Sequence, residues 1–392
     1  MNRSFSSNVW VLSVVLMFAN CSAPVVVFVG SIVGGLLAPN TQLATLPIAL
    51  FIVGVATSTI PSAMLMKRIG RKKVFLGAGG MGVLAAVLAG QSVHAQLFWC
   101  YCAAVFFLGL TNAVVQQYRF AAMESMPADK MTQAASRVLL GGVVAAFMGP
   151  ELALLFKDSA GNEYAGSFYV LAVILCVAWL VLLIGYREVP IESSSTEGEA
   201  RPLRSIFRQP VLWVAISAAG IAFAVMSLIM TATPISMHVV NGHSLADTKW
   251  VIQSHIAAMF LPSLFTAWLV QRVGVAGIMM LGLLALLATV VIGYWDQHLM
   301  HYWVSLVLLG IGWNFLFIGG TVLLPQSYTD SERFKVQATN DMLVFSAQAV
   351  VSVMSGWLLF SVGWQMLLLL CLPLMLIQCL VVAYWKFRVE TV

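Results

Sequence analysis

The chain has 392 residues, of which 61% are hydrophobic and only 9% charged, and its mean hydropathy is +0.94. Soluble proteins carry about 25% charged residues, so a soluble core does not account for this composition. A net charge of +5 would suit a nucleic-acid ligand in a soluble protein, but here the basic residues cluster between apolar runs. We therefore expect the lipid bilayer as a partner, and no nucleic acid.

Apolar runs recur along the whole chain, and each is close to the length of about 20 residues that a membrane-crossing helix needs. They are continuous, unlike the alternating pattern of a transmembrane β-barrel. The predicted fold class is therefore an all-α membrane protein. Its twelve predicted spans lie at about 8–36, 43–66, 74–93, 96–122, 132–156, 165–186, 210–236, 249–270, 275–294, 302–325, 337–358 and 363–386.

Residues 187–209 form the only long polar stretch, and Ser, Glu, Pro and Gly are prominent in it. This composition is typical of a flexible linker. It divides the chain into a six-helix bundle at 1–186 and a second six-helix bundle at 210–392.

The two halves share sequence. AMLMKRIG at 63–70 matches AWLVQRVG at 267–274, and TQAASRVLL at 132–140 matches VQATNDMLV at 336–344, both at an offset of 204 residues. Parallel repeats of this kind form transporters whose binding site lies between the halves near the bilayer midplane. We therefore predict two pseudo-symmetric bundles.

Basic residues decide the orientation, because cytoplasmic loops are enriched in Lys and Arg. With both termini in the cytoplasm, the Lys67–Lys73 cluster and the linker arginines lie inside, whereas the outer loops hold only Lys157 and Lys249. The prediction is a multi-pass protein of a bacterial inner (plasma) membrane with both termini cytoplasmic. We expect it to act as a monomer.

The turn after the second span resembles the signature loop of the major facilitator superfamily, G-x-L-x-D-R-x-G-R-K. The residues in register are Leu65, Arg68, Gly70, Arg71 and Lys72. Two positions depart from it, because Ala63 replaces the glycine and Lys67 the aspartate. The resemblance covers the whole chain and implies the superfamily fold and transport by alternating access.

Two further family features are incomplete. Gly149-Pro150 in span 5 is similar to the family's antiporter motif, but Ala153-Leu154 stands where a glycine pair is expected. The arginine that many members carry in mid-span 4 would fall near Val105 and is absent. Transfer of an antiport mechanism is correspondingly weakened.

The cytoplasmic gate is predicted around the signature loop, with Arg68, Gly70 and Arg71. In the family, the loop's aspartate engages the start of span 11. Here a charge-swapped pair of Lys67 with Asp341 would replace that contact, and the repeat places Arg137 near Gln271 as its counterpart. The alternative for Asp341 is helix capping, because an acid is favoured at a helix N-terminus.

Ionisable residues inside spans are costly and are usually functional or paired. Glu151 and His255 lie at similar depth in spans 5 and 8, which the resemblance places opposite each other. We predict Glu151, His255 and Asp341 as candidates for carrying a coupling proton. The alternative for Glu151 and His255 is a hydrogen bond that only latches the outer gate.

Polar residues on one face of a membrane helix indicate a cavity or a helix interface. Asn112, Gln116 and Arg119 are spaced for one face of span 4, and a second polar face in span 11 includes Gln348, Ser352 and Ser355. With Asn20 and Asn314 they are the candidate substrate cavity. For Arg119 the alternative is that its charge reaches the cytoplasmic surface.

Two other kinds of site are not expected. GAGGMG at 77–82 matches a dinucleotide-binding pattern, but it lies inside an apolar span, where close helix packing explains it better. The histidines do not cluster at ligand spacing, so we expect no metal and no cofactor. Neither a nucleotide-binding loop nor a catalytic constellation emerges, so we expect no enzyme and no direct ATP drive.

The sequence therefore predicts a secondary active transporter that moves a small organic solute, with protons as the coupling partner. The antiporter-like Gly149-Pro150 favours efflux, and its incomplete context leaves uptake by symport open. A transporter-like sensor or a lipid-handling protein without coupled flux is the alternative from another class.

Overall fold

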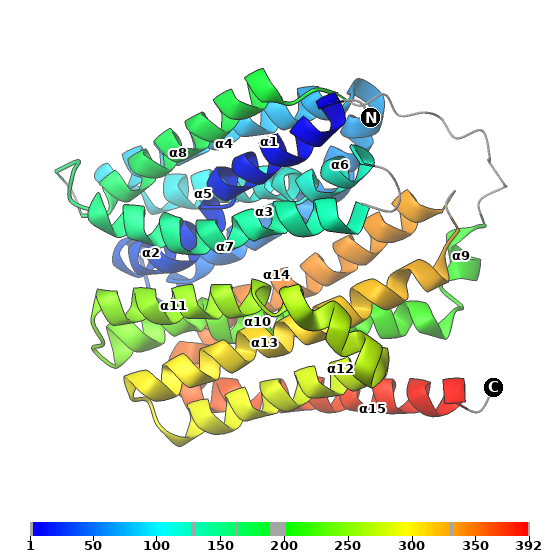
Figure 1. The fold of residues 1–392 in the computed structure, drawn as a ribbon. Helices are drawn as coiled ribbons and strands as arrows, with labels where there is room; N and C mark the ends of the chain where they lie inside the picture. Colours follow the sequence, from blue (N-terminus) through cyan, green and yellow to red (C-terminus); the bar gives the residue numbers. More distant parts are fainter. Residues whose placement is uncertain (1–2, 127–130, 162, 189–200, 330–331, 391–392) are drawn as a thin grey trace. The chain divides into compact units, whose positions relative to one another are not determined.

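The structure is a computed structural model, which describes residues 3–126, 131–161, 163–188, 201–329 and 332–390. The described residues form two compact units, Met1–Ile191 and Glu192–Val392, and their regular structure is entirely helical (Figure 1). The first unit contains α1 (Arg3–Ala19), α2 (Ser22–Leu37), η1 (Thr41–Leu43), α3 (Leu46–Ile69), α4 (Arg71–His94), α5 (Phe98–Val115), α6 (Tyr118–Glu124), α7 (Met131–Leu155) and α8 (Ala165–Gly185). The second contains α9 (Leu203–Ile206), α10 (Pro210–Pro234), the π-helix η3 (Ile235–Val240), α11 (Leu245–Phe260), α12 (Ser263–Trp295), α13 (Leu299–Leu323), η4 (Leu324–Ser327), α14 (Arg333–Leu369) and α15 (Cys371–Glu390).

These helices account for the twelve predicted spans. Within the described ranges, nine helical stretches are long and apolar enough to cross a membrane. One of them, Lys335–Phe387, has 53 residues and bends at Gly363, so it supplies spans 11 and 12. Span 5 is α7, with its apolar part at Leu140–Leu155, and span 8 is α11 with the first part of α12. The all-α membrane fold is confirmed.

Three predicted spans are broken rather than continuous. Span 1 breaks at Asn20 and Cys21, between α1 and α2, and span 8 breaks at Leu261 before Pro262. Proline lacks an N–H donor, so it is tolerated at a helix start and interrupts a helix interior. Span 4 breaks after Gln116, where Gln117 N donates to the Val114 carbonyl at 3.0 Å in a tighter turn. Arg119 consequently lies on a separate helix, α6, and the expected continuous face through Arg119 was wrong.

Glycines with positive φ mark the same turns in both units. Gly70 (φ 90°) separates α3 from α4, and Gly274 (φ 73°), 204 residues later, bends α12 sharply (Figure 1). Gly161 (φ 77°) and Gly363 (φ 82°) form a second such pair, 202 residues apart. Residues with a Cβ disfavour this left-handed region, so these positions favour glycine. The repeat seen in the sequence is therefore also present in backbone geometry.

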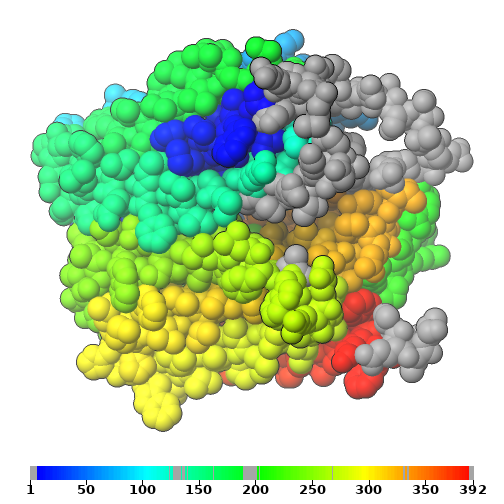
Figure 2. All heavy atoms as spheres, viewed as in Figure 1, coloured from blue at the N-terminus to red at the C-terminus, as the bar shows by residue number. Residues whose placement is uncertain are grey.

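Small residues allow the helices to cross closely, as membrane helix packing requires. A Cβ on Gly109 of α5 would meet the Phe51 carbonyl of α3, and a Cβ on Gly310 of α13 would lie 2.6 Å from the His255 carbonyl of α11. The α12 and α13 helices likewise pack along each other (Figure 2). In α4, Gly79 receives the Trp179 ring, whose Nε1 donates to the Leu76 carbonyl at 2.9 Å. The motif GAGGMG thus lies in a helix interior, and its Gly79 is at a packing contact.

Candidate functional site

The signature turn of the first unit is held by an ion pair. Arg71 Nη2 donates to Glu124 Oε1 at 2.5 Å, which ties the start of α4 to the end of α6. The side chain of Arg71 is only 11% exposed, whereas Lys67 and Arg68 are exposed in the last turn of α3. Cations at a helix C-terminus are favoured by the helix dipole. Arg71 thus makes a partly buried charge contact in this turn.

Asp341 does not begin a helix. α14 starts at Arg333, eight residues earlier, so Asp341 lies two turns inside it and a capping role for this residue was wrong. Its Oδ1 accepts a hydrogen bond from Asn340 Nδ2 at 3.0 Å. Arg137 in α7 and Gln271 in α12 are both exposed. The pairings of Lys67 with Asp341 and of Arg137 with Gln271 join residues of different units and stay predictions.

Glu151 and His255 have different surroundings. Glu151 follows Pro150 near the C-terminal end of α7 and is exposed. His255 in α11 is fully buried, and its Nδ1 lies 2.8 Å from the Leu306 carbonyl of α13. Because a carbonyl only accepts, Nδ1 carries the proton, and Nε2 is a buried lone pair without a partner among the described residues. His255 thus has an unpartnered ring nitrogen, among the described residues, inside the second unit.

Asn112 and Asn314 lie 202 residues apart, close to the repeat offset of 204 residues. Asn314 Nδ2 donates to the Met259 carbonyl at 2.8 Å and to Ser263 Oγ at 2.7 Å, and its Oδ1 accepts from Thr266 Oγ1 at 3.2 Å. It therefore fastens α13 to the break between α11 and α12. Asn112 is also buried, but its Nδ2 has no hydrogen-bond partner among the described residues.

The other candidate cavity residues of the first unit lie around helix breaks. Gln116 Nε2 approaches Asn112 Oδ1 at 3.5 Å, at the end of α5. The Arg119 guanidinium lies 4.7 Å from the centre of the Phe120 ring. Asn20 is half-buried at the turn between α1 and α2. Asn20, Asn112 and Gln116 thus lie where membrane helices are interrupted.

Gln348 and Ser352 lie in a ladder of polar contacts between α10 and α14. Gln348 Nε2 donates to Ser227 Oγ at 2.7 Å, and Ser352 Oγ lies 3.2 Å from Thr231 Oγ1. One turn further, Ser355 Oγ donates to the Leu228 carbonyl at 2.9 Å. Ser227, Thr231, Gln348 and Ser352 are buried.

Aromatic rings gather beside this ladder. The rings of Trp313 and Phe317 on α13 are stacked, with centroids 4.8 Å apart. Phe223 of α10 meets Trp313, Phe317 and Phe345 edge-on at 5.1, 5.6 and 5.5 Å. Phe260 of α11 lies 6.2 Å from Trp313. Helices α10 and α11 of the second unit therefore bring rings to the Trp313 indole of α13, and Phe345 of α14 packs against Phe223.

The predicted linker, 187–209, is fastened at both ends, and residues 189–200 lie outside the described ranges. In the first unit, Asn8 Nδ2 donates to the Arg187 carbonyl at 2.8 Å, and Arg187 N donates to Asn8 Oδ1 at 3.0 Å. Asn8 Nδ2 also donates to Ser125 Oγ at 3.3 Å. The start of the linker is thus bound to Asn8 of α1, and Asn8 is in turn bound to Ser125, which follows α6.

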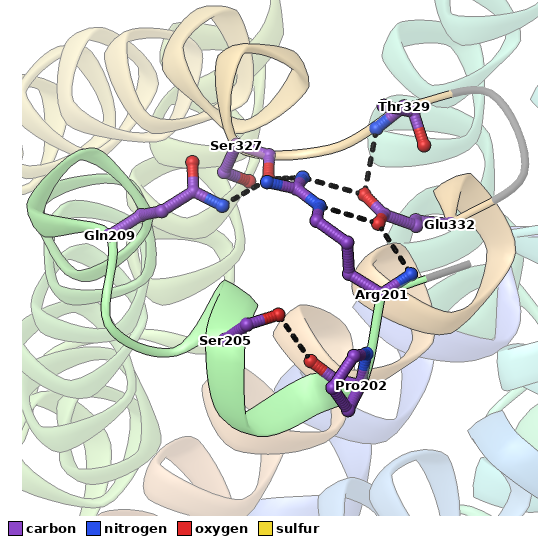
Figure 3. A network of polar contacts seen from close by, with 7 residues as sticks. All are labelled: Arg201, Pro202, Ser205, Gln209, Ser327, Thr329 and Glu332. Carbon is purple, nitrogen blue, oxygen red and sulfur yellow. Dashed lines mark hydrogen bonds and ion pairs between the residues drawn. The ribbon is translucent and has the colours of Figure 1, made fainter. Parts of the chain in front are cut away.

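In the second unit, Arg201 forms an ion pair with Glu332, which directly precedes α14 (Figure 3). Arg201 Nε and Nη2 donate to the two carboxylate oxygens at 2.7 and 2.8 Å, and Arg201 N adds a third bond at 2.9 Å. Thr329 N also donates to Glu332 at 2.9 Å. Bidentate Arg–carboxylate pairs combine strength with fixed geometry. The hydrogen bond from Arg201 holds the pKa of Glu332 well below its usual range, although burial acts in the opposite direction.

Ser327 completes this network. Its carbonyl accepts from Gln209 Nε2 at 2.9 Å and from Arg201 Nη2 at 3.3 Å (Figure 3). The end of the linker is therefore bound to the segment between α13 and α14. Sequence reasoning missed these anchors, because Asn8, Glu332 and Ser327 are far from the linker in sequence. The charges of Arg201 and Glu332 were visible, but nothing in their spacing joined them.

No group of three or more His, Cys, Asp or Glu side chains within the described ranges has the geometry to hold a metal ion. The six cysteines are not in disulfides.

The family profile described as Major Facilitator Superfamily matches residues 10–248 and 218–392. The chain belongs to this superfamily. It is similar over its whole length to the riboflavin transporter RfnT of Brucella anthropi, at 35% identity over 94% of this chain and 92% of that protein. It also resembles two uncharacterised MFS-type transporters of Bacillus subtilis, YddS at 29% identity (92% of this chain, 87% of that protein) and YdeG at 28% (96% and 92%).

Solved structures of superfamily transporters share the fold. A bacterial homologue of the human lysosomal transporter Spinster, inward-facing and unoccupied, aligns with a TM-score of 0.77 at 13% identity, covering 97% of each chain. The nucleoside transporter NupG aligns with a TM-score of 0.75 at 12% identity, covering 96% of this chain and 99% of that one. On the family profile and the curated relatives, this superfamily member is a multi-pass membrane transporter of a small solute.

Proposed function

We propose that this protein is a secondary active transporter of riboflavin or of a solute with the same chemistry, a planar heteroaromatic ring carrying a hydroxylated chain. The observation that carries the proposal is the 35% identity to a riboflavin transporter over 94% of this chain. Likeness over both halves supports a shared substrate class, because substrate sites in such transporters are built from both repeats.

The side chains inside the spans fit such a solute. The second unit offers aromatic rings around Trp313 and hydroxyl and amide groups at Ser227, Thr231 and Gln348. Binding pockets for organic molecules combine apolar and aromatic surface with a few placed polar groups. Riboflavin is uncharged near neutral pH, so it needs no fixed counter-charge within the membrane.

The energy source in this proposal is a proton gradient, with His255 and Glu151 as the candidate proton carriers and Asp341 as a third. His255 supports it as a titratable side chain within a span whose Nε2 has no partner among the described residues. The His255→Gln and Glu151→Gln variants are expected to bind riboflavin but to lose the dependence of transport on a pH gradient. A neutral exchange in α11 away from this nitrogen, Ser254→Ala, is the control. Unchanged pH dependence in both variants contradicts the proton role.

The direction of transport is argued from two pairs of residues in α7. Gly149-Pro150 in α7 favours efflux by proton antiport, and Ala153-Leu154, in place of the family's glycines, leaves uptake by symport open. Orientation is inferred to place both termini in the cytoplasm of a bacterial inner membrane, with a monomer alternating between states. Gating is proposed to use Arg68, Gly70 and Arg71, together with the pairs Lys67–Asp341 and Arg137–Gln271.

The decisive experiment is riboflavin flux into proteoliposomes, followed by flavin fluorescence, with and without an imposed pH gradient. Saturable flux that accelerates with the gradient is expected, and the sign of the effective gradient separates antiport from symport. Protein-free liposomes are the control. Binding without flux would favour the sensor or lipid-handling alternative, and neither binding nor flux would exclude riboflavin as the substrate.

A further inference from the structure

The indole of Trp313 is buried among aromatic rings of the second unit. The residue is 4% exposed, and its Nε1 has no partner among the described residues. Burying a donor without a bond is costly, and buried polar groups in native proteins are nearly always satisfied. An indole with no polar role is replaceable by phenylalanine at little cost. An unpaired indole N–H inside a transporter is therefore a candidate donor to a solute, which is bound during only part of the transport cycle.

The surroundings of this donor define which partner fits. Trp313 is stacked on Phe317 and meets Phe223 and Phe260, and all three phenyl rings are partly exposed rather than sealed. Aromatic faces and edges favour other flat rings at centroid distances of about 4.5–7 Å. The group that fits is a planar ring bearing a carbonyl oxygen, which accepts the indole N–H.

A polar ladder continues from this aromatic layer along the same helices. On α10, Phe223, Ser227 and Thr231 follow each other at intervals of four residues, which is one helix face. They meet Phe345, Gln348 and Ser352 of α14 in the same order. The first contact is between two aromatic rings, the second is between the Gln348 amide and the Ser227 hydroxyl, and the third is between two hydroxyl groups.

We propose that Trp313 and this ladder form the ring-and-chain recognition element of the second unit. The Trp313 N–H binds a carbonyl oxygen of the solute's planar ring, packed against Phe223 and Phe345. The hydroxylated chain of the solute lies along the ladder and exchanges hydrogen bonds with Thr231 and Ser352. This inference rests on the proposed function, and it specifies that the aromatic residues bind the ring of the solute and the ladder binds its chain.

Reaching the donor requires a movement of side chains, because Nε1 is sealed in this conformation. Rotation of Phe223 or Phe260, whose rings are partly exposed, would open it. The two ladder contacts can open because each hydroxyl exchanges a bond to its neighbour for one to the solute. The number of hydrogen bonds made by the ladder hydroxyls then changes little, and the Trp313 N–H gains one.

The first arm of the test measures binding of riboflavin to the purified full-length protein by quenching of flavin fluorescence. Lumiflavin, which has the same ring with a methyl group in place of the chain, is the second probe. Trp313→Phe keeps a ring and removes the N–H, so Kd for both probes is expected to rise about 3- to 10-fold. The matched control is Trp303→Phe, because Trp303 also has a buried, unpartnered Nε1 and is stacked on Trp250. It is expected to change Kd less than about twofold.

The second arm removes one rung of the ladder with the double variant Thr231→Val plus Ser352→Ala. Removing both partners leaves no unpaired group, so the fold is expected to survive. Kd for riboflavin is expected to rise about 3- to 10-fold while Kd for lumiflavin changes less than about twofold. This arm stands even if Trp313→Phe fails to fold.

The outcomes separate this inference from the proposed function. If the wild-type protein binds riboflavin and neither the Trp313 variant nor the ladder variant changes Kd, the recognition element is wrong and the proposed function stands. Equal losses of riboflavin and lumiflavin in the ladder variant contradict the assignment of the chain to the ladder. If the wild-type protein binds neither probe, the proposed function fails and this inference fails with it.

Discussion

Asn112 and Asn314 are buried asparagines of the two units, 202 residues apart and so close to the repeat offset, yet they differ in what they bind. Asn314 has three hydrogen bonds, to Met259, Ser263 and Thr266, across a helix break. Asn112 leaves its Nδ2 without a partner among the described residues. A repeat therefore preserves the position of a polar group without preserving its role. Asn314 stabilises the second unit by bonding α13 to α11 and α12. The Nδ2 donor of Asn112 in the first unit has no partner among the described residues.

The signature turns differ in the same way. In the first unit, Glu188 lies against Gly70, and Arg71 is paired with Glu124. In the second, no atom of the described residues beyond its chain neighbours lies within 4 Å of a Cβ built on Gly274, and Arg272 stacks over Trp268 at 4.6 Å. The first turn is thus fixed by charge, and the second turn is open.

The largest expected effect separates the two asparagines. Asn314→Leu removes three hydrogen bonds and leaves the Met259 carbonyl and the Ser263 hydroxyl without that donor, so the free energy of unfolding should fall by about 2–4 kcal/mol. Asn112→Leu should change it by less than about 1 kcal/mol, because an unpaired donor is lost. Thermal unfolding in detergent measures both. Equal destabilisation by the two variants would contradict the different structural roles of Asn112 and Asn314.

The turn glycines come next. Gly70→Ala and Gly274→Ala both place a Cβ at positive φ, which costs about 1–2 kcal/mol. Gly70→Ala also displaces the Glu188 carboxylate, so it should lower the midpoint of thermal unfolding more than Gly274→Ala. The control is Glu188→Ala, in whose background the two alanine variants should become similar. A persistent difference there would contradict the role of Glu188.

The linker anchor of the second unit predicts a dependence on pH. The pKa of Glu332 is lowered from its ordinary value of 4.5 by the hydrogen bond from Arg201. A lowered folded-state pKa stabilises the fold fully above pH 4.5, and this contribution is lost as the pH falls further. Glu332→Gln should lower the midpoint by on the order of a few degrees at pH 7, and the difference from wild type should shrink below pH 4.5. A constant difference between pH 7 and pH 3, in thermal unfolding, would contradict the assignment.

The smallest effect on stability, and the sharpest on transport, concerns Lys67 and Asp341. An exposed ion pair contributes about 0–1 kcal/mol, which is enough to bias a gate between two states. Lys67→Asp should impair riboflavin flux in proteoliposomes, and adding Asp341→Lys should partly restore it. Asp341→Lys alone is the matched control. A double variant no better than Lys67→Asp would count against the pair.

The sequence alone determined the helical membrane class, the twelve spans, the repeat and the superfamily. Each follows from local signals, namely the length of apolar runs, the placement of charges and the spacing of glycines such as Gly70 and Gly274. Tertiary structure decided the helix breaks at Asn20, Gln116 and Leu261, and the contacts of each polar side chain. Sequence spacing could place Asn112 and Asn314 together in the repeat, but hydrogen-bond satisfaction depends on neighbours far away in the chain. Arg201 with Glu332 and Trp313 with Phe223 became visible only when packing brought distant helices together.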